Sequence, residues 1–247
     1  GNGGDLELEM TLQQVKKSMQ KIVDDGEKGE SALCVCPANY ENRAICEYLE
    51  SLTEKQKLYC AKNLRDKATA VLDLFNGGHQ PKFDWTDEKI TVREKSGLRE
   101  SDAVADPARR QITIQRENFI QQRPPERVFL VTHELFHLVD FAGQRLHDDE
   151  PVGPFERQDG SRQLLNSLGS AVAMKASTEN IYADYQEASK LSKNYARNWF
   201  RLAYGTRSGE NKDTTFAMKD YSGAEFEYHR GLTSRIGVFG KLRSYHG

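Results

Sequence analysis

Two histidines and a glutamate near the middle of the chain have the types and spacing needed to hold and use a metal ion. They are His133, Glu134 and His137, in the run VTHELFHLVD between Val131 and Asp140. On a helix, residues four apart lie on the same face, so both imidazoles can reach one ion. Zinc in catalytic sites takes three protein ligands and a water molecule. Glu134 borders the same face, where a general base for that water must stand.

The segment around these residues predicts a buried helix from Pro125 to Ala142. Pro124 and Pro125 suit a first helical turn, and the residues that follow are apolar on most of the helix surface. Buried histidines and a buried glutamate are costly unless they are bonded or bind a metal. The alternative is a core helix whose histidines form hydrogen bonds with their neighbours.

The run HELFHLVD resembles the zincin metallopeptidases. It looks most like the gluzincin branch and, within it, the lethal-factor-type toxin peptidases, which carry His-Glu-x-x-His-x-x-Asp. The resemblance implies an endopeptidase that uses Zn²⁺ to hydrolyse peptide bonds of a specific protein substrate. It also implies an α+β fold, mainly helical, with a small antiparallel sheet beside the motif helix. In this family an edge strand binds the substrate backbone as an added strand.

A catalytic zinc needs a third protein ligand, and the resemblance implies a glutamate from a later helix. Glu225, within the run YSGAEFEY, looks like that ligand. Ser222 and Glu225 also fit a capping box, in which the glutamate bonds to the backbone at a helix start. Glu179 is the alternative third ligand, although the helix dipole would also favour an acidic residue there. Asp184, Glu187, or a tyrosine or histidine remain further possibilities.

Two supporting roles follow from the same interpretation. Asp140 stands three residues after His137, on the same side of the predicted helix, where a carboxylate can orient an imidazole. An ion pair with a nearby arginine is the alternative for Asp140. Tyr221 precedes Glu225 as the family's tyrosine precedes its ligand, and it is a candidate to stabilise the oxyanion. Tyr228 and His229 are the other candidates for that role.

An acidic loop follows the motif helix, with His147 and three carboxylates in the run HDDE. A histidine beside carboxylates can resemble a metal site. We expect this loop instead to be solvated, with weak ion affinity at most.

Hydrophobic spacing predicts the remaining elements. Residues 1–78 read as a helical N-terminal lobe and residues 79–247 as the zincin-like metallopeptidase domain. The expected helices are Leu6–Val23, Ala44–Phe75, Arg162–Ala176, Ser177–Leu202 and Ser222–Leu232. The expected strands are Lys89–Arg93 and Gln111–Gln115, joined by a long hairpin connection over Glu94–Arg110.

Composition restricts the partners of the chain. The formal net charge of -2 gives no electrostatic case for nucleic acid. No apolar run approaches membrane-spanning length, and the first residues lack the charged and apolar regions of a signal peptide. The four cysteines, Cys34, Cys36, Cys46 and Cys60, do not have the spacing of a zinc site. Reduced cysteines are the main interpretation, and a disulfide pair is the alternative.

The resemblance also suggests a bacterial effector or toxin, delivered into a host cell by a dedicated secretion system. Two other functions stay open. One is a binding or scaffold protein on a zincin fold, although an intact Glu134 speaks against a site without catalysis. The other is a zinc amidase that acts on a non-protein amide.

Overall fold

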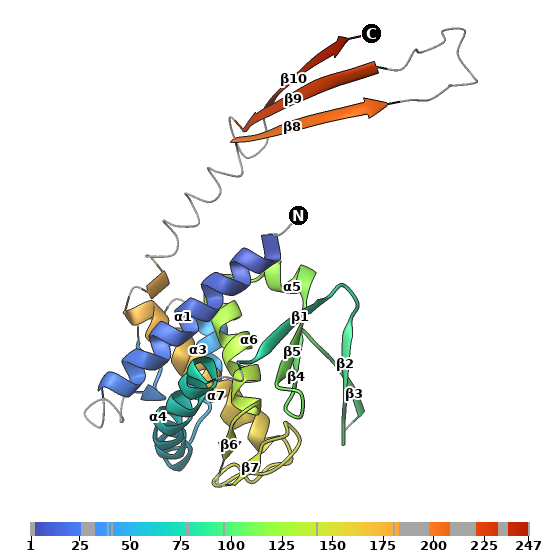
Figure 1. The fold of residues 1–247 in the computed structure, drawn as a ribbon. Coiled ribbons are helices and arrows are strands. Elements are labelled where there is room, and N and C mark those ends of the chain that lie inside the picture. The colour runs from blue at the N-terminus through green and yellow to red at the C-terminus, as the bar shows by residue number, and fades with distance from the viewer. Residues whose placement is uncertain are drawn as a thin grey trace. The chain divides into compact units, whose positions relative to one another are not determined.

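The computed structural model describes most of the first three quarters of the chain and three strands near its end (Figure 1). The described residues are 3–25, 33–38, 40, 42–77, 80–95, 97–141, 143–179, 181–182, 198–207, 221–231 and 237–246. The chain divides into two compact units, Gly1–Ala183 and Asp184–Gly247. The fold is α+β and mainly helical, as the sequence predicted.

The described N-terminal residues of the first unit form the helices α1 (Gly3–Asp25), α3 (Arg43–Glu50) and α4 (Glu54–Asn76). The long helix predicted from Ala44 is therefore two helices. The predicted helix is interrupted at Thr53. The Thr53 hydroxyl accepts a hydrogen bond from the Gln56 backbone N–H, and the Gln56 side chain accepts one from the Thr53 backbone N–H. This capping box starts a new helix in place of continuing the old one.

The motif helix α6 (Pro124–His137) follows the short helix α5 (Arg116–Gln121) and packs against α7 (Gly160–Thr178). Helix α6 ends at His137, before the predicted end at Ala142. Gly169 lies where α7 crosses α6, and a Cβ atom there would be 3.1 Å from the Phe129 carbonyl oxygen. The absence of a side chain at Gly169 thus permits the close approach that brings α7 beside the motif helix.

A three-stranded sheet lies beside α6, in the order β1-β5-β4. Strand β5 (Gln111–Gln115) pairs in parallel with β1 (Lys82–Thr86) and antiparallel with β4 (Ala103–Asp106). A separate antiparallel hairpin consists of β2 (Ile90–Glu94) and β3 (Gly97–Ser101). The strands predicted around β2 and β5 are confirmed, but the hairpin predicted between them is wrong. The predicted connection contains β3 and β4, and β2 pairs with β3 while β5 pairs with β1 and β4.

The N-terminal helices share a core with α6 and α7, because α1 packs against α4, α6 and α7. An ion pair between Glu7 and Arg127 joins α1 to α6. The fully buried side chains of this core include Val15, Met19, Ile22, Leu64, Val71, Leu135, Phe136, Leu164 and Leu168. The boundary predicted at residue 78 therefore falls inside the first unit.

Two disulfides tie the segment before α3 to the helices that follow it. Cys34 is bonded to Cys60 on α4, and Cys36 is bonded to Cys46 on α3. The main interpretation of the sequence, reduced cysteines, was wrong. The alternative of disulfide pairing holds for all four.

The second unit contains an antiparallel sheet in the order β8-β9-β10. Its strands are β8 (Asn198–Arg207), β9 (Tyr221–Gly231) and β10 (Gly237–His246). The helix predicted over Ser222–Leu232 is wrong, because β9 occupies those positions. The helix predicted up to Leu202 is likewise wrong from Asn198 onward, and its middle lies outside the described residues.

No helix in the described part of the chain combines the length and the apolar character that crossing a membrane requires.

Candidate metal centre and its cleft

His133 and His137 lie one turn apart at the C-terminal end of α6, as predicted. Their Nε2 atoms are 3.2 Å apart, and both side chains are largely buried. The His137 Nδ1–H donates to the Leu146 carbonyl oxygen at 2.8 Å. In a neutral imidazole this bond leaves the Nε2 lone pair free to bind a cation.

Asp148 adds a third potential ligand atom to the two histidines, and the sequence did not predict it. Its Oδ1 lies 3.4 Å from the Nε2 of His133 and 3.4 Å from that of His137. Only 13% of the Asp148 side chain is exposed, so the expectation of a solvated acidic loop was wrong for this residue. His147, the residue before Asp148 in the run HDDE, is exposed.

The chain reaches this position through a tight reversal after α6. Strands β6 (Asp140–Phe141) and β7 (Gln144–Arg145) form a short antiparallel pair, and Gly143 between them has a φ of 87°. A positive φ of this size favours glycine over residues with a Cβ atom. The reversal returns the chain to the end of α6, where Leu146 and Asp148 meet the two histidines.

The three ligand atoms of His133, His137 and Asp148 have the separation that zinc requires. They form a triangle with edges of 3.2, 3.4 and 3.4 Å. Tetrahedral zinc with bonds of about 2.0–2.1 Å places its ligand atoms about 3.3–3.4 Å apart. Asp148 Oδ1 is buried and has no hydrogen-bond partner among the described residues, an arrangement that is costly without a cation. Two imidazoles and one carboxylate suit zinc better than calcium or magnesium, which prefer oxygen ligands.

The electrostatics of the triangle also favour a positive charge at its centre. Burial by itself raises the pKa of Asp148, but the neighbouring His133 and His137 outweigh it and hold the pKa far below the usual range. Burial lowers the pKa of His137, but Asp148 and Glu134 outweigh it, and the net pKa is raised. Both shifts thus favour a positive charge beside the Asp148 carboxylate.

Glu134 stands between two hollows that meet at the triangle. The larger, about 660 Å³, is lined by His133, Glu134 and Asp148 and by the aromatic rings of Tyr48 and Phe129. These rings stack with centroids 5.3 Å apart. The smaller hollow, about 140 Å³, is lined by Glu134, His137 and Asp148. Glu134 is 5% exposed and reaches both hollows, as a base acting beside the metal must.

The smaller hollow is also lined by Ala103, Val104 and Ala105 of β4. Among the described strands, β4 pairs only with β5, so it forms one edge of the three-stranded sheet. The strand at this edge is β4, which the sequence did not predict.

Asp140 does not orient either imidazole. Because α6 ends at His137, Asp140 belongs to β6, where it is exposed and pairs with Arg145 at 3.6 Å. The alternative given for Asp140, an arginine ion pair, is correct. The Leu146 carbonyl takes the orienting role for His137 instead.

Glu179 lies at the opposite end of α7 from the metal centre. Its carboxylate pairs with Lys175 at 3.0 Å and with Lys21 at 4.0 Å. Arg162, in the first turn of α7, contacts Asp148. At ~1.5 Å per helical residue, Glu179 is roughly 25 Å along the helix from Arg162.

Tyr221 and Glu225 lie on β9 in the second unit, and the structure describes the backbone there but not the side chains. Tyr221 pairs with Arg207, and Glu225 pairs with Ala203 and with Arg243. A strand has no helix start to cap, so the capping-box alternative for Glu225 is excluded. Their predicted roles, and those of Tyr228 and His229 on the same strand, stay predictions. Asp184 and Glu187 lie outside the described residues.

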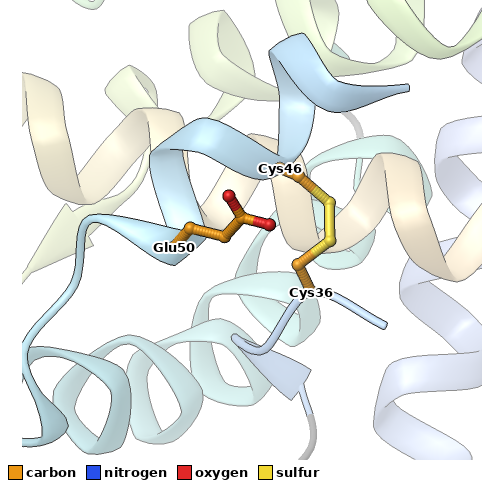
Figure 2. A group of neighbouring side chains, drawn as sticks. All are labelled: Cys36, Cys46 and Glu50. Carbon is orange, nitrogen blue, oxygen red and sulfur yellow. A yellow bond between two sulfur atoms is a disulfide. The ribbon is translucent and has the colours of Figure 1, made fainter. Parts of the chain in front are cut away.

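A second group of potential ligands, Cys36, Cys46 and Glu50, does not form a metal site (Figure 2). Both sulfur atoms are joined in the disulfide, and Glu50 accepts a hydrogen bond from Arg43 at 2.8 Å. A disulfide sulfur has no thiolate to offer a metal. Within the described residues, this leaves the triangle at the end of α6 as the candidate centre.

Comparison with known proteins gives no match: neither a protein-family model, nor a curated protein, nor a solved structure corresponds to this chain. The resemblance of HELFHLVD to the zincins therefore stands on the motif itself. The functional argument rests on the geometry of His133, Glu134, His137 and Asp148.

Proposed function

We propose that this chain is a zinc-dependent endopeptidase with His133, His137 and Asp148 as its zinc ligands. The observation that carries the proposal is the near-equilateral triangle of two imidazole nitrogens and one carboxylate oxygen that accepts no hydrogen bond from the described residues. Three protein ligands with an open fourth position are typical of catalytic zinc. The triangle opens on a cleft beside Glu134, so a bound substrate would meet metal and base together.

A bound zinc ion would activate a water molecule and polarise the scissile carbonyl. Glu134 is placed to accept a proton from the attacking water and to deliver it to the leaving amine. Because Glu134 is buried, bulk water is poorly placed to act as the proton acceptor in its place. The Leu146 carbonyl keeps His137 in the tautomer that can serve as a ligand.

The substrate we propose is an extended peptide. Strand β4 has one edge without a strand partner among the described residues and borders the hollow that contains Glu134 and His137. A peptide added along this edge would bond through its backbone and leave its side chains for the two hollows. The cleft of about 660 Å³ is within the usual size range of ligand sites.

We retain the secreted effector or toxin as part of the proposal. Disulfides persist in oxidising environments and are rare in the cytosol. Cys34–Cys60 and Cys36–Cys46 thus support a chain that passes through an oxidising compartment.

The test is cleavage of denatured proteins and a peptide library by the zinc-loaded chain and by Glu134→Gln. The variant should keep its zinc, since Glu134 is not a ligand, and lose about 10²–10⁴-fold in kcat/KM. Glu126→Gln is the matched control. Glu126 lies on the same helix and accepts the Arg123 backbone N–H, a bond that glutamine retains.

Full activity in Glu134→Gln would exclude this mechanism. A zinc-loaded chain that cleaves no peptide but hydrolyses a non-protein amide would support the amidase. A chain that binds zinc and cleaves neither would support the binding protein.

A further inference from the structure

The carboxylate of Asp148 is held on its other side by two arginines. Arg99 Nη2 donates to Asp148 Oδ2 at 2.9 Å, and Arg162 Nε donates to the same oxygen at 3.2 Å. Both arginines also reach Glu94: Arg99 Nε contacts its Oε1 at 2.6 Å and Arg162 Nη2 contacts its Oε2 at 2.5 Å. The four side chains form a closed ring of alternating charge.

This ring is mostly shielded from water. The side chains of Glu94 and Asp148 are 6% and 13% exposed, that of Arg162 is 24% exposed, and that of Arg99 is 39% exposed. The two carboxylates are thus better shielded than the arginines. Ion pairs removed from water are favourable only when their geometry is good and their hydrogen bonds are made. Each arginine here contacts its two carboxylates through different nitrogens of its planar group, a fork geometry that the single nitrogen of a lysine lacks.

The ring joins three segments that are distant in the sequence. Glu94 ends β2 and Arg99 lies on β3, two positions beyond the Gly97 that pairs with Glu94. Arg162 lies in the first turn of α7, and Asp148 lies in the loop after β7. The turn of the hairpin is also tied to this loop, because the Lys95 backbone N–H donates to Asp149 Oδ2 at 3.1 Å. Figure 1 shows the hairpin standing beside the strands that flank α6.

We propose that Glu94, Arg99 and Arg162 are positioning residues that make Asp148 a one-oxygen metal ligand. A carboxylate can offer a metal either oxygen or both. Here both arginine bonds go to Oδ2, while Oδ1 faces the two histidines without a hydrogen bond among the described residues. Glu94 fixes the two arginines in turn, and so holds the orientation of Asp148. The inference rests on the proposed function, since it assumes a metal at this triangle.

The ring also connects metal binding to the wall of the cleft. Arg99 and Ser101 of β3 line both hollows, and Arg99 directly contacts Asp148, the proposed metal ligand. A bound metal that fixes Asp148 would therefore also fix the hairpin that borders the substrate.

The experiment measures zinc affinity by competition with a chelator, together with the visible spectrum of the cobalt-substituted protein. The variants are Arg99→Lys, Arg162→Lys and Glu94→Gln. Each keeps a polar side chain but cannot complete the ring. Loss of residues that orient a ligand typically weakens metal binding about 10–100-fold, and we expect that range here. The cobalt spectrum should change, because Asp148 is released to bind through both oxygens or neither.

Arg43→Lys is the matched control, because Arg43 makes an exposed pair with Glu50 away from the ring. It should retain zinc affinity and cobalt spectrum. Far-ultraviolet circular dichroism verifies that each variant is folded, and the two arginine variants carry the test if Glu94→Gln does not fold. A wild-type chain that binds no zinc would overturn the proposed function, and this inference with it. A wild-type chain that binds zinc, with Arg99→Lys and Arg162→Lys unchanged in affinity and spectrum, would overturn this inference alone.

Discussion

Replacing both members of a disulfide by serine should cost the first unit a measurable and calculable part of its stability. Cys34–Cys60 closes a sequence separation of 26 residues and Cys36–Cys46 a separation of 10. In the chain-entropy account, loops of these lengths stabilise the folded state by about 3.5 and about 2.7 kcal/mol. Cys34 and Cys60 are 1% and 0% exposed, so the buried hydroxyls of serines at these positions would add to the loss of about 3.5 kcal/mol expected for this disulfide.

The assay is urea unfolding followed by circular dichroism at a helical wavelength, because the described helices all belong to the first unit. The Cys34→Ser/Cys60→Ser variant should lose about 3.5 kcal/mol, which corresponds to a fall in Tm of roughly 7–14 °C. The Cys36→Ser/Cys46→Ser variant should lose less. Thiol titration of the unfolded, unreduced wild type should find no free thiol.

Two results would refute this reasoning. One is a count of four free thiols in the unfolded, unreduced chain. The other is a wild-type urea midpoint that a reducing agent leaves unchanged. Either would show that these cysteines do not restrict the unfolded chain in solution.

Three further predictions follow from individual contacts. Asp140→Asn should leave zinc affinity unchanged in a chelator competition, because Asp140 is exposed and contacts neither histidine; weaker binding would restore its orienting role. The hydrogen bond from Lys175 lowers the pKa of Asp25 below its ordinary value of 3.8. This pairing therefore stabilises the fold at pH values above 3.8, and the stabilisation is lost as the pH falls through the lower pKa of the folded state. Lys175→Met should therefore cost roughly 0.2–1 kcal/mol at neutral pH and nothing in strong acid, as urea midpoints at both pH values would show. Gly169→Val should cost about 1–3 kcal/mol in the same assay, because its side chain would press on the Phe129 carbonyl and separate α7 from α6; an unchanged midpoint would mean that the crossing is loose.

The half of the metal centre that lies on one helix was predictable from the sequence. His133, Glu134 and His137 have helical spacing within an apolar run, and local periodicity is enough to place them together. Asp148 was not predictable in this way. It reaches the centre through the reversal at Gly143, and its burial depends on Arg99 and Arg162, which come from distant elements.

The errors in secondary structure have similar physical causes. Strand β4 was not predicted, because it is short, lies in a charged stretch and is stabilised by pairing with β5. In β9, the run EFEY alternates polar and aromatic residues as strands do, but Ser222 and Glu225 suggested a helix cap. Pairing with both β8 and β10 outweighs that local preference.

Whether Asp148 is the third zinc ligand is decided by the zinc content of the purified chain and of its single-residue variants, measured after metal-free purification and zinc addition. We predict about one zinc per chain in the wild type, in Glu225→Ala and in Glu179→Ala, and none held tightly in Asp148→Ala. Loss of zinc in Glu225→Ala with retention in Asp148→Ala would contradict the account and make Glu225 the third ligand.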